Sequence, residues 1–285
     1  MKMMKSRHYF NDIPYTKWPF FISIWLFLFI FYFVLYINKY LFADWLTLLI
    51  PFIIMVYYIM EWFFDLDSEA VYLGRHNTKV KSSIVFGFFL FLTTEALLFA
   101  GFFWAFFDRF FHTSFETSDL SLPYGIEHVV WARWPLFATL ILVTSGYCCN
   151  LSYYYIKVGN YDSSLFYSYV TLALALSFLG IQFFEYSSLR FSISDSVYCS
   201  LFYLLTGFHG MHVVIGTIFL AIQTDRLYYL NLTKESHLGY SLALIYWHFV
   251  DIIWIFLFIF VYFKNNPKFT YQFMKLSRKS WYWYS

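Results

Sequence analysis

The sequence predicts an all-α integral membrane protein with seven transmembrane helices. Of its 285 residues, 61% are hydrophobic and 27% are aromatic, which is more apolar surface than a soluble domain of this size can bury. Apolar runs close to or above the roughly 18 to 20 residues that cross a bilayer as a helix recur along the whole chain. These runs lack the alternation of apolar and polar residues that is typical of a membrane β-barrel, so helices are the expected spanning form.

The apolar runs divide the chain into three regions. Residues 1–17 form an N-terminal segment, residues 18–263 form one seven-helix membrane domain, and residues 264–285 form a basic and aromatic C-terminal tail. The first apolar run is longer than the core of a secretory signal and lacks a cleavage site of small residues, so it is interpreted as a span. The predicted spans, separated by polar connections, are 18–36, 45–64, 82–107, 131–155, 165–186, 196–223 and 238–263.

Composition also excludes some classes of function. The formal net charge of +2 is too small for a nucleic-acid-binding protein, and the basic residues lie in connections and tails rather than along one face. The three cysteines, Cys148, Cys149 and Cys199, have no C-x-x-C spacing. They predict neither a disulfide framework nor a metal site.

The distribution of basic residues indicates the orientation only slightly. If the N-terminus lies inside, the inner connections hold Arg75, Lys79, Lys81, Lys157, Arg226 and Lys234, against Lys39, Arg109, Arg133 and Arg190 in the outer connections. This excess favours an inside N-terminus. The basic tail would then lie on the opposite side, so the charge pattern alone does not decide the orientation.

The third predicted span contains a carboxylate within an apolar and aromatic run, "TTEALLFAGFFWAFF". Glu95 has no Lys, Arg or His between Ser82 and Asp108, so its own helix offers no cation. Because a buried carboxylate without a partner is held in its neutral form, Glu95 is expected to donate a hydrogen bond or to pair with a group on another helix. Proton handling or contact with a partner chain is the functional alternative to simple packing.

Two further polar clusters lie within predicted spans. The stretch "TGFHGMHVVIG" holds His209 and His212, and "YWHFVDIIW" holds His248 and Asp251, each pair three residues apart on one helix face. A membrane haem or copper site needs several histidines on facing helices, and these spans offer too few, so no metal or redox cofactor is expected in this chain. All four residues are predicted to make interhelical polar contacts, with no catalytic residue among them.

Three polar residues lie near predicted membrane boundaries, where lipid headgroups would sit. Glu69 and His76 fall in the connection 65–81, and Arg226 falls in the connection 224–237. Since most residues at such positions are only solvated, their placement leaves headgroup binding and simple solvation both open.

Three long stretches resemble subunit III of the haem-copper cytochrome c oxidases, most closely the mitochondrial form. They are "TTEALLFAGFFWAFF", "FSISDSVYCSLFYLLTGFHGMHVVIGTIFL" and "YWHFVDIIWIFLFIFVYF". Weaker similarity begins at "KWPF" and includes "GRHNT", so the resemblance covers most of residues 17–263. The occurrence of three long motifs in the same order makes the resemblance specific.

The resemblance implies a fold of two helices and five helices around a lipid-filled cleft. It also implies a subunit of complex IV in the respiratory chain of the mitochondrial inner membrane, which transfers electrons from cytochrome c to oxygen and pumps protons. In that complex the subunit carries no redox centre, stabilises the catalytic subunit I, supports proton uptake and offers a lipid route for oxygen. Haem a, haem a3 and copper belong to partner subunits, and the N-terminus lies on the matrix side.

The resemblance also assigns roles to single residues. Glu95 matches the membrane-buried glutamate of the family near the contact with subunit I, and Glu69, His76 and Arg226 match positions near bound phospholipid headgroups. One departure is Ser68, where the family often has an arginine. Membership of a respiratory supercomplex and the contacts of the tail stay open.

Two other functions compete with that of an oxidase subunit. An independent proton or solute transporter would use Glu95, His209, His212 and Asp251 as a relay, but the sequence has no internal repeat of the kind that marks many transporters. A haem-binding cytochrome is opposed by the small number of facing histidines. The sequence therefore favours the oxidase subunit.

Overall fold

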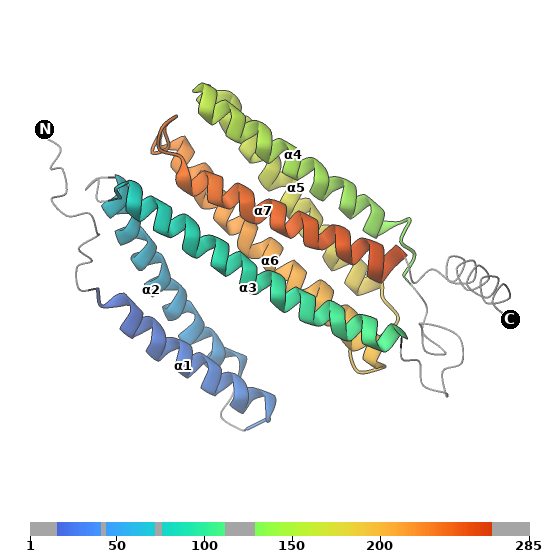
Figure 1. The fold of residues 1–285 in the computed structure, drawn as a ribbon. Coiled ribbons are helices and arrows are strands. Elements are labelled where there is room, and N and C mark those ends of the chain that lie inside the picture. The colour runs from blue at the N-terminus through green and yellow to red at the C-terminus, as the bar shows by residue number, and fades with distance from the viewer. Residues whose placement is uncertain (1–15, 41–43, 72–75, 112–128, 264–285) are drawn as a thin grey trace, which may run out of the picture. The chain divides into compact units, whose positions relative to one another are not determined.

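The computed structural model describes residues 16–40, 44–71, 76–111 and 129–263. Within these ranges, seven helices are long and apolar enough to cross a membrane, which confirms the predicted all-α membrane fold. In chain order they are α1 (Trp18–Ile37), α2 (Trp45–Val71), α3 (Thr78–Phe111), α4 (Trp134–Val158), α5 (Tyr161–Ser188), α6 (Val197–Tyr228) and α7 (Leu238–Leu257), the last continued by the π-helix η1 (Phe258–Phe263) (Figure 1). The tail 264–285 and nearly all of the segment 1–17 lie outside the described residues.

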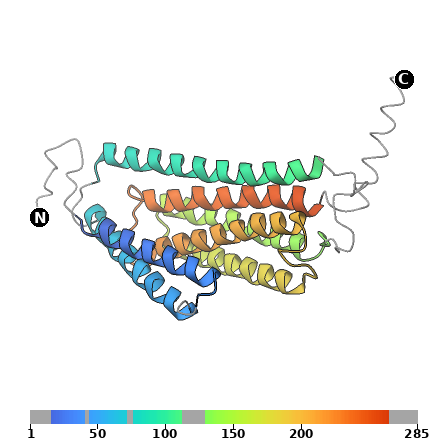
Figure 2. The ribbon, with the colours of Figure 1, turned by 90° about the horizontal axis from the view of Figure 1, so that it is seen from below.

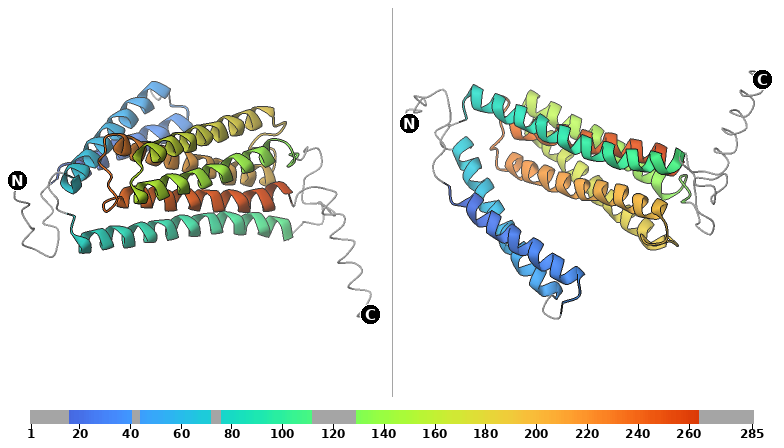
Figure 3. Two further views of the ribbon diagram at one scale, coloured as in Figure 1. Left: turned by 90° about the horizontal axis from the view of Figure 1, so that it is seen from above. Right: turned by 60° about the horizontal axis from the view of Figure 1, so that its bottom comes forward.

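The chain forms two compact units, Met1–Phe86 and Gly87–Ser285. In the first unit, α1 and α2 lie side by side as a hairpin (Figures 1 and 3). The indole Nε1 of Trp18 donates a hydrogen bond of 2.6 Å to Asp65 Oδ2, and the rings of Phe21 and Tyr58 stack with centroids 5.0 Å apart. Helix α1 has no buried residue, so its apolar surface is available to lipid or to another chain.

The second unit is centred on α7, whose large aromatic side chains fill the space between its neighbours. Trp247 and Trp254 are fully buried, and their indole N–H groups donate to Ser145 Oγ and Thr139 Oγ1 on α4, each at 3.0 Å. Since hydrocarbon offers no hydrogen-bond partner, a tryptophan inside a span needs such an acceptor from another helix. The same bonds fix the rotation of α7 against α4.

Hydroxyl groups of serine and tyrosine also join α4, α5 and α7. Ser152 of α4 lies 2.7 Å from Ser168 of α5, and Tyr240 of α7 donates to Ser152 Oγ at 2.7 Å. Serine side chains allow helix backbones to approach closely and also bond across the interface. The turn between α4 and α5 is correspondingly short, because Gly159 adopts a left-handed conformation with φ of 87°.

Phenylalanine rings, rather than closely spaced backbones, join α3 to the rest of the second unit. Phe102 meets Phe208 of α6 with ring centroids 5.1 Å apart, and Phe107 meets Phe260 of η1 at 5.0 Å. Helix α3 therefore runs along α7 at one edge of this unit (Figures 2 and 3). Most other side chains of α3 are exposed at the surface of this chain.

Several helices extend beyond their predicted ends. Glu69 and Arg226, predicted in connections, lie instead in the last turns of α2 and α6. The prediction used the apolar run alone, whereas the helical backbone continues past the hydrocarbon, where water and headgroups solvate polar side chains. The π-helical end of α7 has no counterpart in the predicted pattern.

Substitution of Gly216 should destabilise the second unit. A Cβ atom at this position would lie 3.0 Å from Trp247 Cε3 and 3.2 Å from Tyr246 Cε1, and both rings are buried. We expect Gly216→Leu to cost about 1–3 kcal/mol through overpacking. The measurement is the thermal unfolding midpoint of the solubilised protein.

Gly210→Leu provides the matched control on the same helix, because a Cβ there meets nothing within 4 Å. Equal losses in the two variants would show that helix α6 is disturbed generally and that the contact with Trp247 is not the cause.

Candidate functional site

Glu95 lies in the middle of α3 and is bonded to α6. Its Oε2 lies 2.9 Å from His212 Nε2, and the side chains of the two residues are 21% and 5% exposed. Helix α6 thus supplies the hydrogen-bond partner that a carboxyl group needs inside the membrane. Part of the Glu95 side chain stays exposed at the surface of the chain.

The hydrogen bonds of His212 define how many protons this pair holds. His212 Nδ1 lies 2.7 Å from the carbonyl oxygen of Phe208, which can only accept, so Nδ1 carries a proton. The ring nitrogen Nε2 then accepts from a protonated Glu95, or it donates to an ionised Glu95 if the ring is an imidazolium. In both cases one proton is shared between the carboxyl group and the imidazole.

Aromatic rings enclose the imidazole of this pair. The edge of Phe99 meets the His212 ring at a centroid distance of 5.2 Å, and Tyr246 lies nearly parallel to it at 6.5 Å. Because the rings limit access of water to His212, the interaction with Glu95 is stronger than it would be at an aqueous surface.

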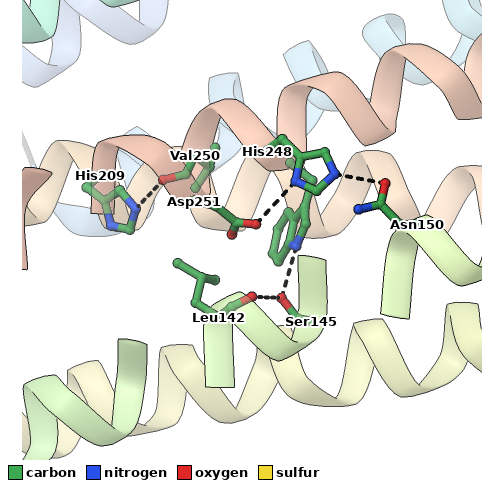
Figure 4. A network of polar contacts seen from close by, with 8 residues as sticks. Leu142, Ser145, Asn150, His209, His248, Val250 and Asp251 are labelled. Atoms are coloured by element: carbon green, nitrogen blue, oxygen red, sulfur yellow. Dashed lines mark hydrogen bonds and ion pairs between the residues drawn. The ribbon is translucent and has the colours of Figure 1, made fainter. Parts of the chain in front are cut away.

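His209 makes contacts that differ from those of His212, although both lie on α6. It is buried, and its Nε2 lies 3.3 Å from the carbonyl oxygen of Val250 on α7 (Figure 4). Its ring packs against Phe178 and Trp254. The two histidines therefore join α6 to different helices. His209 has the role of an interhelical polar contact in this geometry.

His248 and Asp251 face each other on α7. His248 Nδ1 lies 3.6 Å from Asp251 Oδ2, and His248 Nε2 lies 3.1 Å from Asn150 Oδ1 on α4 (Figure 4). The carboxyl group of Asp251 lies against the backbone of α4 at Gly146, where any Cβ atom would meet Asp251 Oδ2. This second pair of acid and histidine thus depends on a glycine in the neighbouring helix.

The three residues predicted near lipid headgroups lie at helix ends. Glu69 and His76 belong to the first unit, on the last turn of α2 and in the connection before α3, and Arg226 belongs to the second unit. Burial lowers the pKa of His76 below its usual value, the Glu69 carboxylate opposes this shift, and Lys81 adds to it. At neutral pH His76 is therefore a hydrogen-bonding group without charge.

No three side chains of His, Cys, Asp or Glu gather to form a candidate metal site within the residues that the structure describes. The expectation of a chain without a metal or redox cofactor is not tested by this observation and stays a prediction.

Comparison with known proteins decides the family. A sequence model described as cytochrome c oxidase subunit III matches residues 8–266. The chain belongs to this family. Curated relatives named cytochrome c oxidase subunit 3 include that of Emericella nidulans, which is 40% identical over 260 residues, or 90% of this chain and 96% of that protein. The relative from Allomyces macrogynus is 43% identical over 208 residues (73% and 76%), and that from Arabidopsis thaliana is 40% identical over 210 residues (74% and 79%).

Family membership confirms the resemblance drawn from the three sequence motifs. A subunit III chain is a component of cytochrome c oxidase, complex IV of the respiratory chain, and so part of an oxidoreductase complex. The roles predicted for single residues are not tested by this membership.

One pair of buried polar residues in this subunit III was not predicted from the sequence. Glu185 is only 1% exposed, and Gln182, one helical turn earlier on α5, is also buried. The sequence did contain a signal, because a Gln and a Glu three residues apart inside an apolar span share one helix face.

Replacing Glu95 should separate its hydrogen-bonding role from its capacity to hold a proton. In Glu95→Gln, the amide can still donate to His212 Nε2, so we expect stability close to that of the wild type. In Glu95→Leu, the buried imidazole nitrogen loses its partner, which should cost about 1–3 kcal/mol. The thermal stability and yield of the purified complex provide the measurement. If Gln were as destabilising as Leu, a neutral hydrogen bond could not be the main contribution of Glu95.

Proposed function

We propose that this subunit III is a non-catalytic component of cytochrome c oxidase that packs against subunit I and supports proton uptake there. Electron transfer from cytochrome c to oxygen takes place in partner chains that hold haem a, haem a3 and copper. The observation that carries this proposal is the pair of Glu95 and His212. It shares one proton inside the membrane and leaves the carboxyl side chain 21% exposed on the chain.

Partial exposure of Glu95 supports a contact with another chain. A carboxyl group that faced lipid would lack hydrogen-bond partners on its open side, and such exposure is costly in hydrocarbon. A neighbouring subunit that covers this face of α3 removes that cost. Because His212 keeps its bond to Phe208 in both forms, the shared proton can move between the carboxyl group and the imidazole while the geometry and the net charge of the pair are kept.

A transporter relay receives less support from the geometry. The two acids bind different histidines, Glu95 with His212 and Asp251 with His248, and His209 bonds to a backbone carbonyl. The contacts of Glu95 with His212 and of His209 with Val250 each join two helices, whereas Asp251 and His248 lie on one helix. These separate contacts of the described residues do not form a chain that leads across the membrane. The residues thus suit a subunit whose main task is to pack and to support a neighbour.

Bound phospholipid is the second part of the proposal. Glu69 and His76 in the first unit and Arg226 in the second bind headgroups, with Arg226 supplying the positive charge, since His76 is neutral at pH 7. The two-plus-five arrangement around a lipid-filled cleft, the oxygen route, the mitochondrial inner membrane and an N-terminus on the matrix side are taken from the family resemblance. Membership of a supercomplex is left open.

The first test is the location and the effect of this chain in the complex. On a native gel of solubilised membranes, mass spectrometry should find it in the band that oxidises cytochrome c, at about one copy per catalytic subunit. Glu95→Gln should then slow steady proton uptake several-fold, well below the roughly 10²–10⁴-fold loss expected of an essential acid or base.

The control for that measurement is His209→Gln, because His209 is a buried histidine of α6, the helix that carries His212, and bonds to Val250 rather than to Glu95. Normal proton uptake in Glu95→Gln would remove the pair from the function, and absence of the chain from the active band would contradict the subunit role itself.

Replacing Arg226 should reduce the amount of bound anionic phospholipid. The guanidinium lies at the end of α6 beside the start of α7, since a Cβ on Gly239 would meet Arg226 Nη1 at 3.1 Å. Arg226→Gln removes the charge and should lower the anionic lipid that copurifies, as measured by mass spectrometry, because a cation near the headgroups contributes about 1 kcal/mol.

Lys157→Gln is the matched control. Lys157 lies in the last turn of α4, and the close approach of Lys234 to Gly159 shows that the α6–α7 connection reaches this end of the bundle. Equal loss of lipid in both variants would point to a general effect of net charge.

A further inference from the structure

Helix α5 of the second unit carries a buried acid that the proposed subunit function does not use. Glu185 lies near the end of α5, is 1% exposed, and neither carboxyl oxygen makes a hydrogen bond of ordinary geometry with any described residue. The amide of Gln182 and the hydroxyl of Tyr262 are buried and unbonded in the same sense. Polar atoms from three buried side chains are therefore left without a protein hydrogen bond of ordinary geometry.

These three side chains belong to one cluster. The hydroxyl of Tyr262 lies close enough to both Glu185 and Gln182 to interact with them. Gln182 in turn lies beside Tyr186, whose hydroxyl is 2.6 Å from Thr206 Oγ1 on α6. The titratable groups that face Glu185 are thus the phenols of Tyr186 and Tyr262.

The backbone at this place is also unusual. Tyr262 lies on the π-helix η1, in which the widened turn shifts side chains away from their α-helical positions. Such segments occur frequently at functional sites. Here the phenol of Tyr262, on the wide turn, lies beside Glu185 of α5. Packing of an apolar core does not need such a polar contact.

We propose that Glu185, Gln182 and Tyr262 form a hydrated proton-holding site, in which a protonated Glu185 binds internal water near one end of the helix bundle. The cluster combines donors and acceptors, namely an amide, a phenol and a carboxyl group, and water satisfies both kinds. A metal ion would need more anionic or carbonyl ligands, and the described residues form no group of three His, Cys, Asp or Glu. Because it is buried and the titratable groups that face it are phenols, the carboxyl group keeps its proton.

The position of the cluster allows exchange with the membrane surface. Glu185 lies three residues before the end of α5 at Ser188, and Tyr262 lies one residue before the end of η1 at Phe263. The polar connection that follows α5 includes Ser192 and Asp195, which bond to each other in an exposed turn. Water is therefore available within a short distance, although the acid itself is covered.

Infrared spectroscopy of the purified complex tests this site. A protonated carboxyl group absorbs in the C=O stretching region, whereas a carboxylate does not, so Glu185→Gln should remove one band of the wild-type spectrum. In D2O that band should shift, because hydration allows the acid proton to exchange. Glu235→Gln, the same substitution at an exposed position, should leave these bands unchanged.

Tyr262→Phe keeps the acid and removes one neighbouring hydroxyl, so it should move the band of Glu185 without removing it. This variant also decides the outcome if Glu185→Gln fails to assemble, and Gln182→Leu serves in the same way. The proposal is overturned if Glu185→Gln removes no band, if the band that it removes does not shift in D2O, or if neither neighbouring variant moves a band.

Discussion

The absence of water from the hydrocarbon core is the constraint on which this structure depends. Inside a bilayer, each polar side chain needs a partner from the protein or from buried water, so the polar residues of the spans help to determine which helices meet. Trp247 and Trp254 bind hydroxyl groups of α4, and Glu95 binds His212 of α6. Aromatic side chains fill the remaining space. Since apolar packing alone selects one rotation of a helix over another only weakly, the polar pairs fix the rotation.

The two pairs of acid and histidine follow the same chemical rule in different surroundings. In each pair one imidazole nitrogen is bonded outside the pair, to the Phe208 carbonyl or to Asn150, and the other faces the acid. The distances differ, 2.9 Å for His212 and Glu95 and 3.6 Å for His248 and Asp251. The tighter pair joins two helices that are otherwise held together by phenylalanine rings, and the looser pair lies within one helix.

Much of this architecture could be predicted from the sequence, because bilayer thickness determines how long an apolar run must be. All seven predicted spans correspond to helices, and His248 and Asp251, predicted on one helix face, lie 3.6 Å apart. The partner of Glu95 could not be predicted, since it depends on which face of α6 turns toward α3. Glu185 shows a different limit: a carboxyl group near the end of an apolar run has the same sequence pattern whether it is solvated or, as here, buried.

The close approach of Asp251 to the backbone of α4 has a consequence for how this protein can change over evolutionary time. A side chain at position 146 would occupy the space of the Asp251 carboxyl group, whereas loss of that carboxyl group would leave a gap beside Gly146. Neither position can change freely alone, but a paired exchange could conserve the volume. The glycine and the aspartate lie more than 100 residues apart in the sequence, and the two positions are therefore expected to covary among related chains.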